Sequence, residues 1–444
     1  MSELVIENRL WNPAAETMPP EDIRALQLAK LKKTVDYAAS HVEFYRREYR
    51  ARHLSAASIQ SLDDLRRFPF TTKQDLRDNY PFGFFAVPKA QLARIHASSG
   101  TTGKPTFVGY THNDLELWSE LCARFLTAGG LTSDQVAQIA FGYGLFTGGF
   151  GLHYGIEKVG AAIVPASSGN TQRQIMLLKD VGINTLICTP SYALNIAETI
   201  ERIGLKPADF ALRFAHFGGE QWTEAMRRNI EEALHIHAFN NYGLSEIIGP
   251  GVSGECAARQ GMHIQEDHFL VECLNPETLE PVPDGEEGEL VITALSKEAC
   301  PIIRYRTRDL ARIYPGHDCP CGRTTRRMSR IKGRTDDMMI IRGVNVFPSQ
   351  LEEALLRVGG TAPHYLIELY RPNNLDEAVL KVEMREQEFS DKMDEMQRLR
   401  DRIDREISSI TGIKFRIELV APNSIERSVG KAKRVADHRN LKVE

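Results

Sequence analysis

Short apolar runs alternate with amphipathic stretches between about residues 160 and 245. The runs predict buried strands, and the stretches between them have helical spacing. This alternation is typical of βαβ units, which build a parallel sheet covered by helices on both faces. The expected strands are Ala161–Pro165, Thr185–Thr189, Arg213–Phe217 and His237–Asn241, and the expected helices are Thr171–Lys179, Tyr192–Arg202 and Thr223–Ala233.

Ligands of parallel sheets bind at the carboxyl ends of the strands. The residues expected there are Thr189-Pro190, Gly218-Gly219-Glu220 and Tyr242-Gly243. Active-site chemistry is therefore expected at this edge of the sheet.

Beyond about residue 335 the pattern changes to that of a compact α+β unit. Arg342 and Gly343 lie between two apolar runs and predict a tight hairpin. The other expected elements are a helix at Gln350–Val358, strands at Tyr365–Tyr370 and Ala378–Met384, a charged helix whose apolar stripe is Met393, Met396, Ile403, Ile407 and Ile410, and a final strand with Phe415, Ile417 and Leu419. The predicted fold class is α/β, with a large N-terminal domain (1–335) of mixed or parallel sheets flanked by helices and a small α+β C-terminal domain (336–444).

Composition excludes several classes of protein. Hydrophobic residues make up 42% of the chain and charged residues 26%, as in ordinary soluble proteins. The net charge of −4 argues against a nucleic-acid binder and gives no reason to expect a membrane surface as partner. The first twenty residues lack the pattern of a signal peptide, and seven cysteines are too few and odd in number for a disulfide scaffold, so a cytoplasmic location is expected.

A window without formal charge, Val136 to Ile156, contains six glycines together with polar residues. It is too rich in glycine and too polar for a membrane helix. The window predicts either a buried, close-packed turn or the wall of a pocket.

The segment with the clearest candidate chemistry is a loop of hydroxyl-bearing and small residues. Its backbone N–H groups are free to approach phosphate oxygens, and a lysine adds a point charge. It is not a P-loop, because only two residues separate its glycines. By itself, a loop of this composition is more often only a flexible connection. Its residues are Ser98, Ser99, Gly100, Thr101, Thr102, Gly103 and Lys104.

Five motifs in a fixed order resemble the adenylate-forming acyl- and aryl-CoA synthetases. They are the loop above, Asn241-Tyr242-Gly243-Leu244-Ser245-Glu246, Tyr305-Arg306-Thr307-Arg308-Asp309-Leu310, Gly333-Arg334-Thr335-Asp336-Asp337 and Gly430-Lys431. More narrowly, the segments at 69–73, 143–149 and 341–350 are similar to the phenylacetate–CoA ligase family. The resemblance runs from about residue 65 to residue 435. It implies that a carboxylate attacks the α-phosphate of ATP, and that the thiol of coenzyme A then displaces AMP from the acyl-adenylate.

The resemblance also implies roles for single residues. The loop that contains Lys104 would hold the β- and γ-phosphates, and Glu246 would hold Mg²⁺. Asp309 would accept hydrogen bonds from both ribose hydroxyls, and Arg334 would meet ribose or phosphate oxygens. The remaining nucleotide-site residues implied are Gly218, Gly219, Glu220, Asn241, Tyr242, Gly243 and Ser245.

Lys431 is implied as the catalytic cation of the first half-reaction. From the residues alone, a solvated lysine in a basic run is the favoured interpretation. The family usually has proline where this chain has Glu426, which alters the stiffness of the loop but leaves Gly430-Lys431 intact. The resemblance further implies a mobile C-terminal domain hinged at Asp336, which would bring the Arg342-Gly343 hairpin to the pantetheine tunnel.

The glycine-rich window and a later segment are candidates for the acid site. A flat slot for an aryl ring would use aromatic faces and missing side chains. The candidate residues are Tyr143, Phe146, Gly148, Ile247, Gly249 and Pro250. The residues do not identify the acid, and a packing turn remains the alternative.

Cys319 and Cys321 form a short chelating pair, and Cys256 lies seven residues before His263. Together they would complete a Cys₃His zinc site, closed and therefore structural. His317 is a substitute ligand, and ordinary reduced thiols are the alternative. Cys122, Cys188, Cys273 and Cys300 lie in apolar runs and are expected in the core.

The expected partners are an aryl acid, ATP and coenzyme A, with Mg²⁺, and the chain is a candidate homodimer. Two other functions compete with the ligase. One is an adenylate-forming enzyme for a different acid or an acceptor other than coenzyme A. The other is a non-catalytic nucleotide- or zinc-binding protein.

Overall fold

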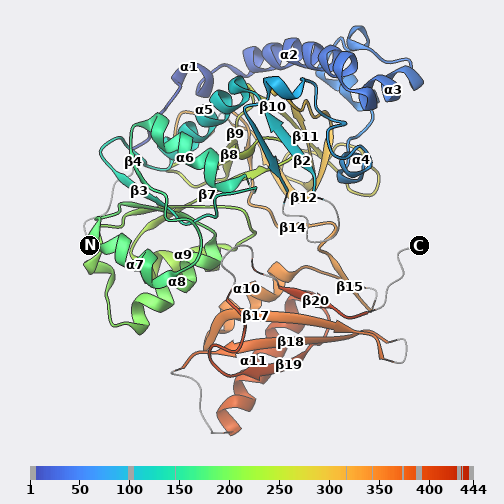
Figure 1. Ribbon diagram of the computed structural model, residues 1–444. Coiled ribbons are helices and arrows are strands. Elements are labelled where there is room, and N and C mark those ends of the chain that lie inside the picture. The colour runs from blue at the N-terminus through green and yellow to red at the C-terminus, as the bar shows by residue number, and fades with distance from the viewer. Residues whose placement is uncertain are drawn as a thin grey trace. The chain divides into compact units, whose positions relative to one another are not determined.

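The computed structural model describes residues 7–98, 105–145, 147–316, 318–342, 344–372, 375–386, 393–427, 432 and 434–439 (Figure 1). The chain folds into two compact units. The first unit comprises Met1–Cys188, Lys206–Gly219 and His235–Arg330. The second unit comprises Thr189–Leu205, Glu220–Leu234 and Ile331–Glu444.

The first unit contains a parallel sheet of five strands. All residues of its β5 and β6 are buried, as expected for strands covered on both faces. The four strands expected from the sequence are confirmed, and the strand order is β7-β6-β5-β3-β4. The strands are β3 (Val136–Ile139), β4 (Ala162–Val164), β5 (Thr185–Cys188), β6 (Phe214–Phe217) and β7 (His237–Leu244).

The same sheet continues as an antiparallel region, so the expected mixed sheet is confirmed. The region begins within β7, which runs three residues further than the sequence predicts. Residues up to Asn240 pair with parallel β6, whereas Asn241 and Tyr242 pair with antiparallel β8. Beyond β7 the order is β8 (Gly249–Glu255), β9 (Met262–Ile264), β13 (Arg327–Met328), β12 (Tyr305–Tyr314), β11 (Glu287–Ala294) and β10 (Phe269–Leu274).

Helices and a small hairpin complete this unit. Thr111 caps α5, because its Oγ1 accepts from the Asp114 N–H and the Asp114 carboxylate accepts from the Thr111 N–H. No helix among the described residues is long and apolar enough to cross a membrane. The elements are α1 (Pro13–Glu16), α2 (Pro20–His41), α3 (Glu43–Ala51), α4 (Lys73–Asp78), α5 (His112–Ala128), α6 (Gly148–Val159), α7 (Thr171–Asp180), β1 (Arg94–Ala97) and β2 (Phe107–Tyr110), with 3₁₀ turns at Ala56–Ser58, Leu62–Arg67, Lys89–Gln91 and Pro207–Asp209.

The glycine-rich window forms β3 and most of α6 rather than a turn alone. Two of its glycines let α6 approach α5 closely. A Cβ at Gly155 would lie 2.4 Å from the Cβ of Cys122, and one at Gly151 would lie 2.2 Å from the Trp118 ring. Close helix packing therefore accounts for part of the glycine content.

The second unit contains a four-stranded sheet in the order β19-β18-β17-β20. The expected hairpin is confirmed. The prediction that the strand near Phe415 is the last one is wrong, because β20 follows it and pairs parallel with β17. β20 has three residues and none is fully buried, so it leaves no apolar alternation in the sequence. The elements are α8 (Pro190–Arg202), α9 (Glu224–Leu234), β14 (Gly333–Arg334), β15 (Met339–Ile341), β16 (Val344–Val346), α10 (Pro348–Val358), β17 (Thr361–Tyr370), β18 (Glu377–Met384), α11 (Met393–Thr411), β19 (Arg416–Val420) and β20 (Val435–Asp437).

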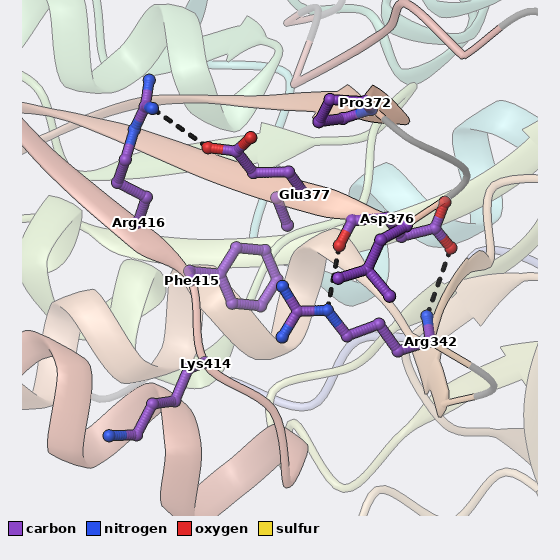
Figure 2. A pocket seen from close by; sticks show the side chains of 9 residues that line it. Arg342, Pro372, Asp376, Glu377, Lys414, Phe415 and Arg416 are labelled. Atoms are coloured by element: carbon purple, nitrogen blue, oxygen red, sulfur yellow. Dashed lines mark hydrogen bonds and ion pairs between the residues drawn. The ribbon is translucent and has the colours of Figure 1, made fainter.

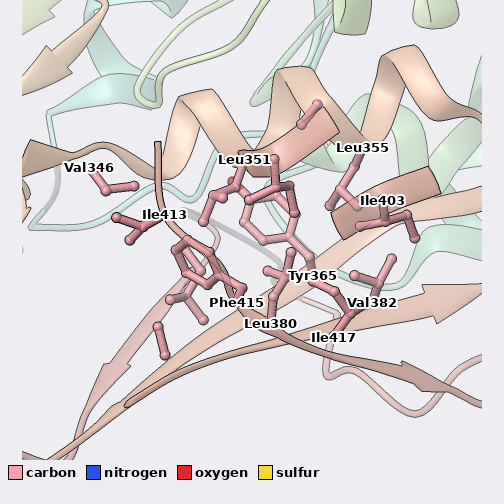
Figure 3. Packing of buried hydrophobic residues seen from close by; sticks show 14 of the residues in the cluster. Val346, Leu351, Leu355, Tyr365, Leu380, Val382, Ile403, Ile413, Phe415 and Ile417 are labelled. Atoms are coloured by element: carbon pink, nitrogen blue, oxygen red, sulfur yellow. The ribbon is translucent and has the colours of Figure 1, made fainter. Parts of the chain in front are cut away.

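The core of this unit packs α10 and α11 against the sheet (Figure 3). Ile403 and Ile407 of the predicted apolar stripe are fully buried there, and Met396 and Ile410 are partly buried. These four members of the stripe are therefore core, as predicted, and the side chain of Met393 lies outside the described part of the structure.

Candidate active site

The second half of β7 and the turn after it place the residues of the Asn241–Glu246 motif. The Asn241 side-chain amide donates to the Phe217 carbonyl at 2.8 Å, which joins the ends of β7 and β6. The Ser245 and Thr147 hydroxyls are hydrogen-bonded at 2.8 Å. The motif therefore lies at the carboxyl edge of the parallel strands, where ligands are expected.

Tyr242 and Asp309 are far apart in the sequence and meet in the fold. The Tyr242 hydroxyl donates to Asp309 Oδ2 at 2.7 Å. The Asp309 N–H donates to the Thr307 hydroxyl at 3.0 Å, which in turn donates to the Leu290 carbonyl. This chain of bonds fixes a carboxylate beside a flat aromatic ring, and Asp309 is only 6% exposed.

Glu246 has a cationic neighbour to which sequence reasoning assigned no role. Lys73 Nζ lies 3.7 Å from Glu246 Oε1. Lys73 begins α4 and follows Thr72, whose hydroxyl accepts from the Asp75 N–H at 3.2 Å and caps the helix. The segment at 69–73 was part of the resemblance, and that was the signal available for this residue.

Of the candidate acid-pocket residues, Tyr143 and Gly148 lie before and at the start of α6. Ile247 lies in the turn after β7, and Gly249 and Pro250 begin β8. A hydrogen bond of 3.1 Å joins the Tyr143 hydroxyl to His153 Nδ1. The Tyr143 ring meets the Phe150 ring edge to face, with centroids 5.2 Å apart. Gly148 begins α6, and Ile247 is fully buried. Phe146 lies outside the described residues.

Ser98 and Thr106, which lie at the two described ends of the phosphate loop, are hydrogen-bonded to each other. The Ser98 and Thr106 hydroxyls lie 2.6 Å apart, and the Ser98 N–H donates to the Thr106 carbonyl at 3.0 Å. These contacts extend the β1–β2 hairpin. Ser99, Gly100, Thr101, Thr102, Gly103 and Lys104 lie outside the described residues.

Other predicted residues belong to the second unit. Arg334 pairs with both carboxylate oxygens of Asp336, at 2.9 and 3.0 Å, so the proposed nucleotide ligand and the proposed hinge residue are partners. The Glu220 carboxylate accepts from the Ser191 N–H at 2.6 Å and from the Ala432 N–H at 3.2 Å. Lys431, the neighbour of Ala432, lies outside the described residues.

The predicted cysteine–histidine set comes together in the first unit. The candidate ligand atoms of Cys256, His263, Cys319 and Cys321 all lie within 4.8 Å of one another, and all four residues are buried. The Cys256 and Cys319 sulfurs are 3.7 Å apart, and the Cys321 sulfur is 3.2 Å from His263 Nε2. The other ring nitrogen of His263 lies 3.2 Å from the Thr325 carbonyl. His317 lies outside the described residues.

The other four cysteines do not join this set. Cys122, Cys188 and Cys300 are buried as expected, whereas Cys273 is only partly buried.

A cavity of about 560 Å³ lies in the second unit beside the β15–β16 hairpin (Figure 2). The Arg342 side chain donates to the Asp376 carbonyl, and its backbone N–H donates to the Asp376 carboxylate at 3.2 Å. The Arg416 guanidinium pairs with Glu377 at 3.0 Å. Lys414 extends away from these pairs, whereas the Phe415 ring lies between them.

Comparison with known proteins supports a single family. Residues 40–295 match the model of the AMP-binding enzymes, and residues 343–439 match that of the AMP-binding enzyme C-terminal domain. The chain is 49% identical to the phenylacetate-coenzyme A ligase of Thermus thermophilus over 97% of its own length and 100% of that protein. It is also 49% identical to the phenylacetate-coenzyme A ligase of Escherichia coli, over 98% of its own length and 99% of that protein.

A solved structure has the same fold. The chain superposes on 2-hydroxyisobutyryl-CoA ligase in complex with an acyl-AMP at a TM-score of 0.91 and 29% identity, covering 96% of this chain and 92% of that one. The α/β fold with a larger N-terminal and a smaller C-terminal part is therefore confirmed. The ordered motifs, the placed Tyr242–Asp309 pair and these similarities agree, and the chain belongs to the phenylacetate–coenzyme A ligase family of AMP-binding enzymes.

Proposed function

We propose that the chain joins phenylacetate, or a close aryl acid, to coenzyme A through an acyl-adenylate, with release of AMP and pyrophosphate. The observation that carries this proposal is the buried Tyr242–Asp309 pair, whose tyrosine belongs to the same motif as Glu246. A flat ring beside a fixed carboxylate suits an adenine and its ribose, and it occurs in a chain of this family.

ATP recognition is assigned to the edge of the sheet. Tyr242 offers a face to adenine, with the backbone of Gly218 and Gly219 near the same ring. Asp309 has acceptor capacity for both ribose hydroxyls. The hydroxyl-rich loop from Ser98 to Lys104 is proposed to hold the phosphates, and Lys431 to steady the attacking carboxylate and the charge on the α-phosphate. Asn241, Gly243 and Ser245 are proposed to line the nucleotide site with their backbone. Glu220 and Arg334 are two further proposed nucleotide-binding residues.

Glu246 fits a magnesium ion held together with ATP. Mg²⁺ is usually bound by one or two carboxylates plus substrate phosphates, and Glu246 is a buried carboxylate that lies 3.7 Å from the Lys73 ammonium. When bound, the ion would neutralise phosphate charge. Lys73 would balance the carboxylate before ATP and its metal arrive.

The acid pocket is assigned to Tyr143, Phe146, Gly148, Ile247, Gly249 and Pro250. A panel of carboxylic acids, assayed for ATP- and CoA-dependent release of AMP, tests both pocket and function. We expect phenylacetate or a close aryl acid to give the highest kcat/KM. If no aryl acid reacts, the proposed function fails. Acyl transfer to an amine or a carrier protein in place of coenzyme A would favour the alternative enzyme.

We place the domain boundary between residues 335 and 336, with Asp336 as the hinge of a mobile C-terminal domain. After adenylation, this domain is proposed to present the Arg342-Gly343 hairpin to the pantetheine arm. Asp336 lies in the turn that follows β14, and hinges are usually a few loop or element-terminal residues that absorb a dihedral change.

Asp336→Pro is expected to leave acid-dependent ATP–pyrophosphate exchange within about threefold of the wild type and to lower CoA-ester formation more than about tenfold. Proline fixes φ and restricts the preceding residue, so the hinge could no longer absorb a dihedral change. Asp336→Asn, which removes the charge but not the backbone freedom, is the control. Equal losses in both half-reactions would contradict the hinge.

Zinc is the second proposed metal, at Cys256, His263, Cys319 and Cys321. In a tetrahedral zinc site with Zn–S distances of about 2.3 Å, two sulfurs lie about 3.8 Å apart. The Cys256–Cys319 distance of 3.7 Å fits this geometry. A bond from His263 Nδ1–H to the Thr325 carbonyl would leave Nε2 free for the metal. With no open position, the ion would be structural.

The purified protein is expected to contain one zinc per chain, and Cys321→Ser to lower both the metal content and the thermal midpoint. Cys273→Ser, a substitution of a partly buried cysteine outside the set, is expected to change neither. Elemental analysis and thermal unfolding check both variants. A zinc content well below one per chain would end the proposal and leave the four residues as reduced thiols and a histidine.

Two further assignments complete the proposal. We propose a cytoplasmic location, in keeping with the sparse cysteines, and a homodimer, which sedimentation of the purified protein would test. A non-catalytic nucleotide-binding protein is the competing class. It would release no AMP with any acid in the panel.

A further inference from the structure

Two aromatic side chains donate hydrogen bonds to the backbone of the turn after β7 and of the first residues of β8. The Tyr110 hydroxyl, at the end of β2, donates to the Ile248 carbonyl at 3.0 Å. The Trp118 indole N–H, on α5, donates to the Pro250 carbonyl at 2.7 Å. These bonds flank Gly249 and lie just after Glu246, so they fix the segment that carries part of the proposed acid pocket and the proposed magnesium ligand.

The two aromatic rings support each other. Their centroids lie 4.9 Å apart with an interplanar angle of 14°, and their exposed fractions are 0% for Tyr110 and 1% for Trp118. A stacked, fully buried pair has little freedom to turn. The Tyr110 hydroxyl and the Trp118 indole N–H therefore belong to stacked rings. A movement of one ring is expected to displace the other.

Lys297 adds a buried cation to this pair. Its Nζ lies 4.5 Å from the centroid of the Tyr110 ring and has no hydrogen-bond partner among the described residues. A cation over an aromatic face is attracted to it, and the attraction is larger where water is excluded. Burial lowers the pKa of Lys297, and the nearby Cys300, Asp114 and Glu246 oppose that shift. Lys297 therefore packs its cation against the ring whose hydroxyl donates to the Ile248 carbonyl.

Gly249 shows how closely Trp118 fits the turn. Its φ is +95°, and a Cβ there would lie 2.4 Å from Cζ2 of Trp118. The backbone at the start of β8 therefore lies against the indole with no room for a side chain. Because the contact is this close, a shift of the Trp118 ring would also move the backbone at Gly249.

We propose that Lys297, Tyr110 and Trp118 are positioning residues that set the place of the Glu246–Pro250 segment and thereby the fit of the acid substrate. This inference rests on the proposed function, because it assigns the selectivity of the same site. The three residues touch neither the acid nor ATP in this account. They act through the two carbonyls to which Tyr110 and Trp118 donate.

The test compares Tyr110→Phe and Trp118→Phe, which keep an aromatic ring but remove a donor. We expect each variant to raise KM for the acid about fivefold or more while KM for ATP stays within twofold. The ratio of kcat/KM for phenylacetate to that for 3-phenylpropionate should change as well. Tyr49→Phe is the matched control, because Tyr49 is similarly buried and its hydroxyl has no partner among the described residues.

Lys297→Met is expected to raise the acid KM in the same way, and Lys297→Arg, which keeps the cation, to restore it toward the wild-type value. Unchanged acid kinetics in the two phenylalanine variants, or equal changes in KM for acid and ATP, would overturn the inference even if Lys297→Met does not fold. A wild-type chain that activates no aryl acid would instead overturn the proposed function, and the inference with it.

Discussion

Glu246→Gln is expected to lower the rate of acid-dependent ATP–pyrophosphate exchange at least about 100-fold, equivalent to ~2.7 kcal/mol of transition-state stabilisation. The amide keeps the shape of the side chain but removes the charge that would hold Mg²⁺ beside the phosphates. It would also leave Lys73, which lies 3.7 Å away, without its carboxylate. The apparent affinity for Mg²⁺, measured from the dependence of the rate on free Mg²⁺, should fall in parallel.

Glu280→Gln provides the matched control for this substitution. Glu280 is an exposed carboxylate in the loop between β10 and β11 of the same unit, so its amide variant should retain the wild-type rate and the wild-type Mg²⁺ dependence. A Glu246→Gln variant with an unchanged Mg²⁺ dependence would contradict the assignment of Glu246 as the metal ligand, whatever its rate.

Asp309→Asn should raise KM for ATP about 30-fold, or ~2 kcal/mol, because hydrogen bonds to charged groups are the strong ones. A carboxylate can accept from both ribose hydroxyls while it also accepts from the Tyr242 hydroxyl. An amide has one acceptor oxygen and an NH₂ group that donates. Steady-state kinetics with ATP varied at saturating acid measure the effect, and the acid KM should stay within about threefold.

Tyr242→Phe separates the two partners of this pair. It removes the donor to Asp309 but keeps the ring, so we expect a smaller rise in KM for ATP, about three- to fivefold, as for a single hydrogen bond. The rise in KM caused by Asp309→Asn should be smaller for 2′-deoxy-ATP, which lacks one of the two ribose hydroxyls, than for ATP. An Asp309→Asn variant that discriminates between the two nucleotides as the wild type does would show that Asp309 does not contact the 2′-hydroxyl.

The parallel sheet could be predicted from the sequence because strands buried on both faces read as continuous apolar runs. β5 and β6 are of this kind and begin and end within a residue of their predicted limits. The extension of β7 was not predictable in the same way. Past Asn240 it pairs with β8, whose glycines and polar residues carry no strand pattern. β20 was missed because pairing with β17, not burial, defines it.

The residues of the site that belong to recognisable sequence motifs could be predicted. The Tyr242–Asp309 contact and the cysteine–histidine set join residues that were named from the sequence. Lys297 and Trp118 could not be found in this way. A single lysine in a short loop and a tryptophan within an amphipathic helix have no local signal of function, and only the fold shows what their side chains contact.

The most direct test of the account is the fate of oxygen from the acid. With both carboxylate oxygens of phenylacetate labelled as ¹⁸O, attack on the α-phosphorus forms an acyl–O–P bond, and the thiol then expels AMP with that oxygen. We predict one ¹⁸O atom in each AMP and one in the thioester carbonyl. AMP without label, or ADP with label in inorganic phosphate, would contradict the acyl-adenylate.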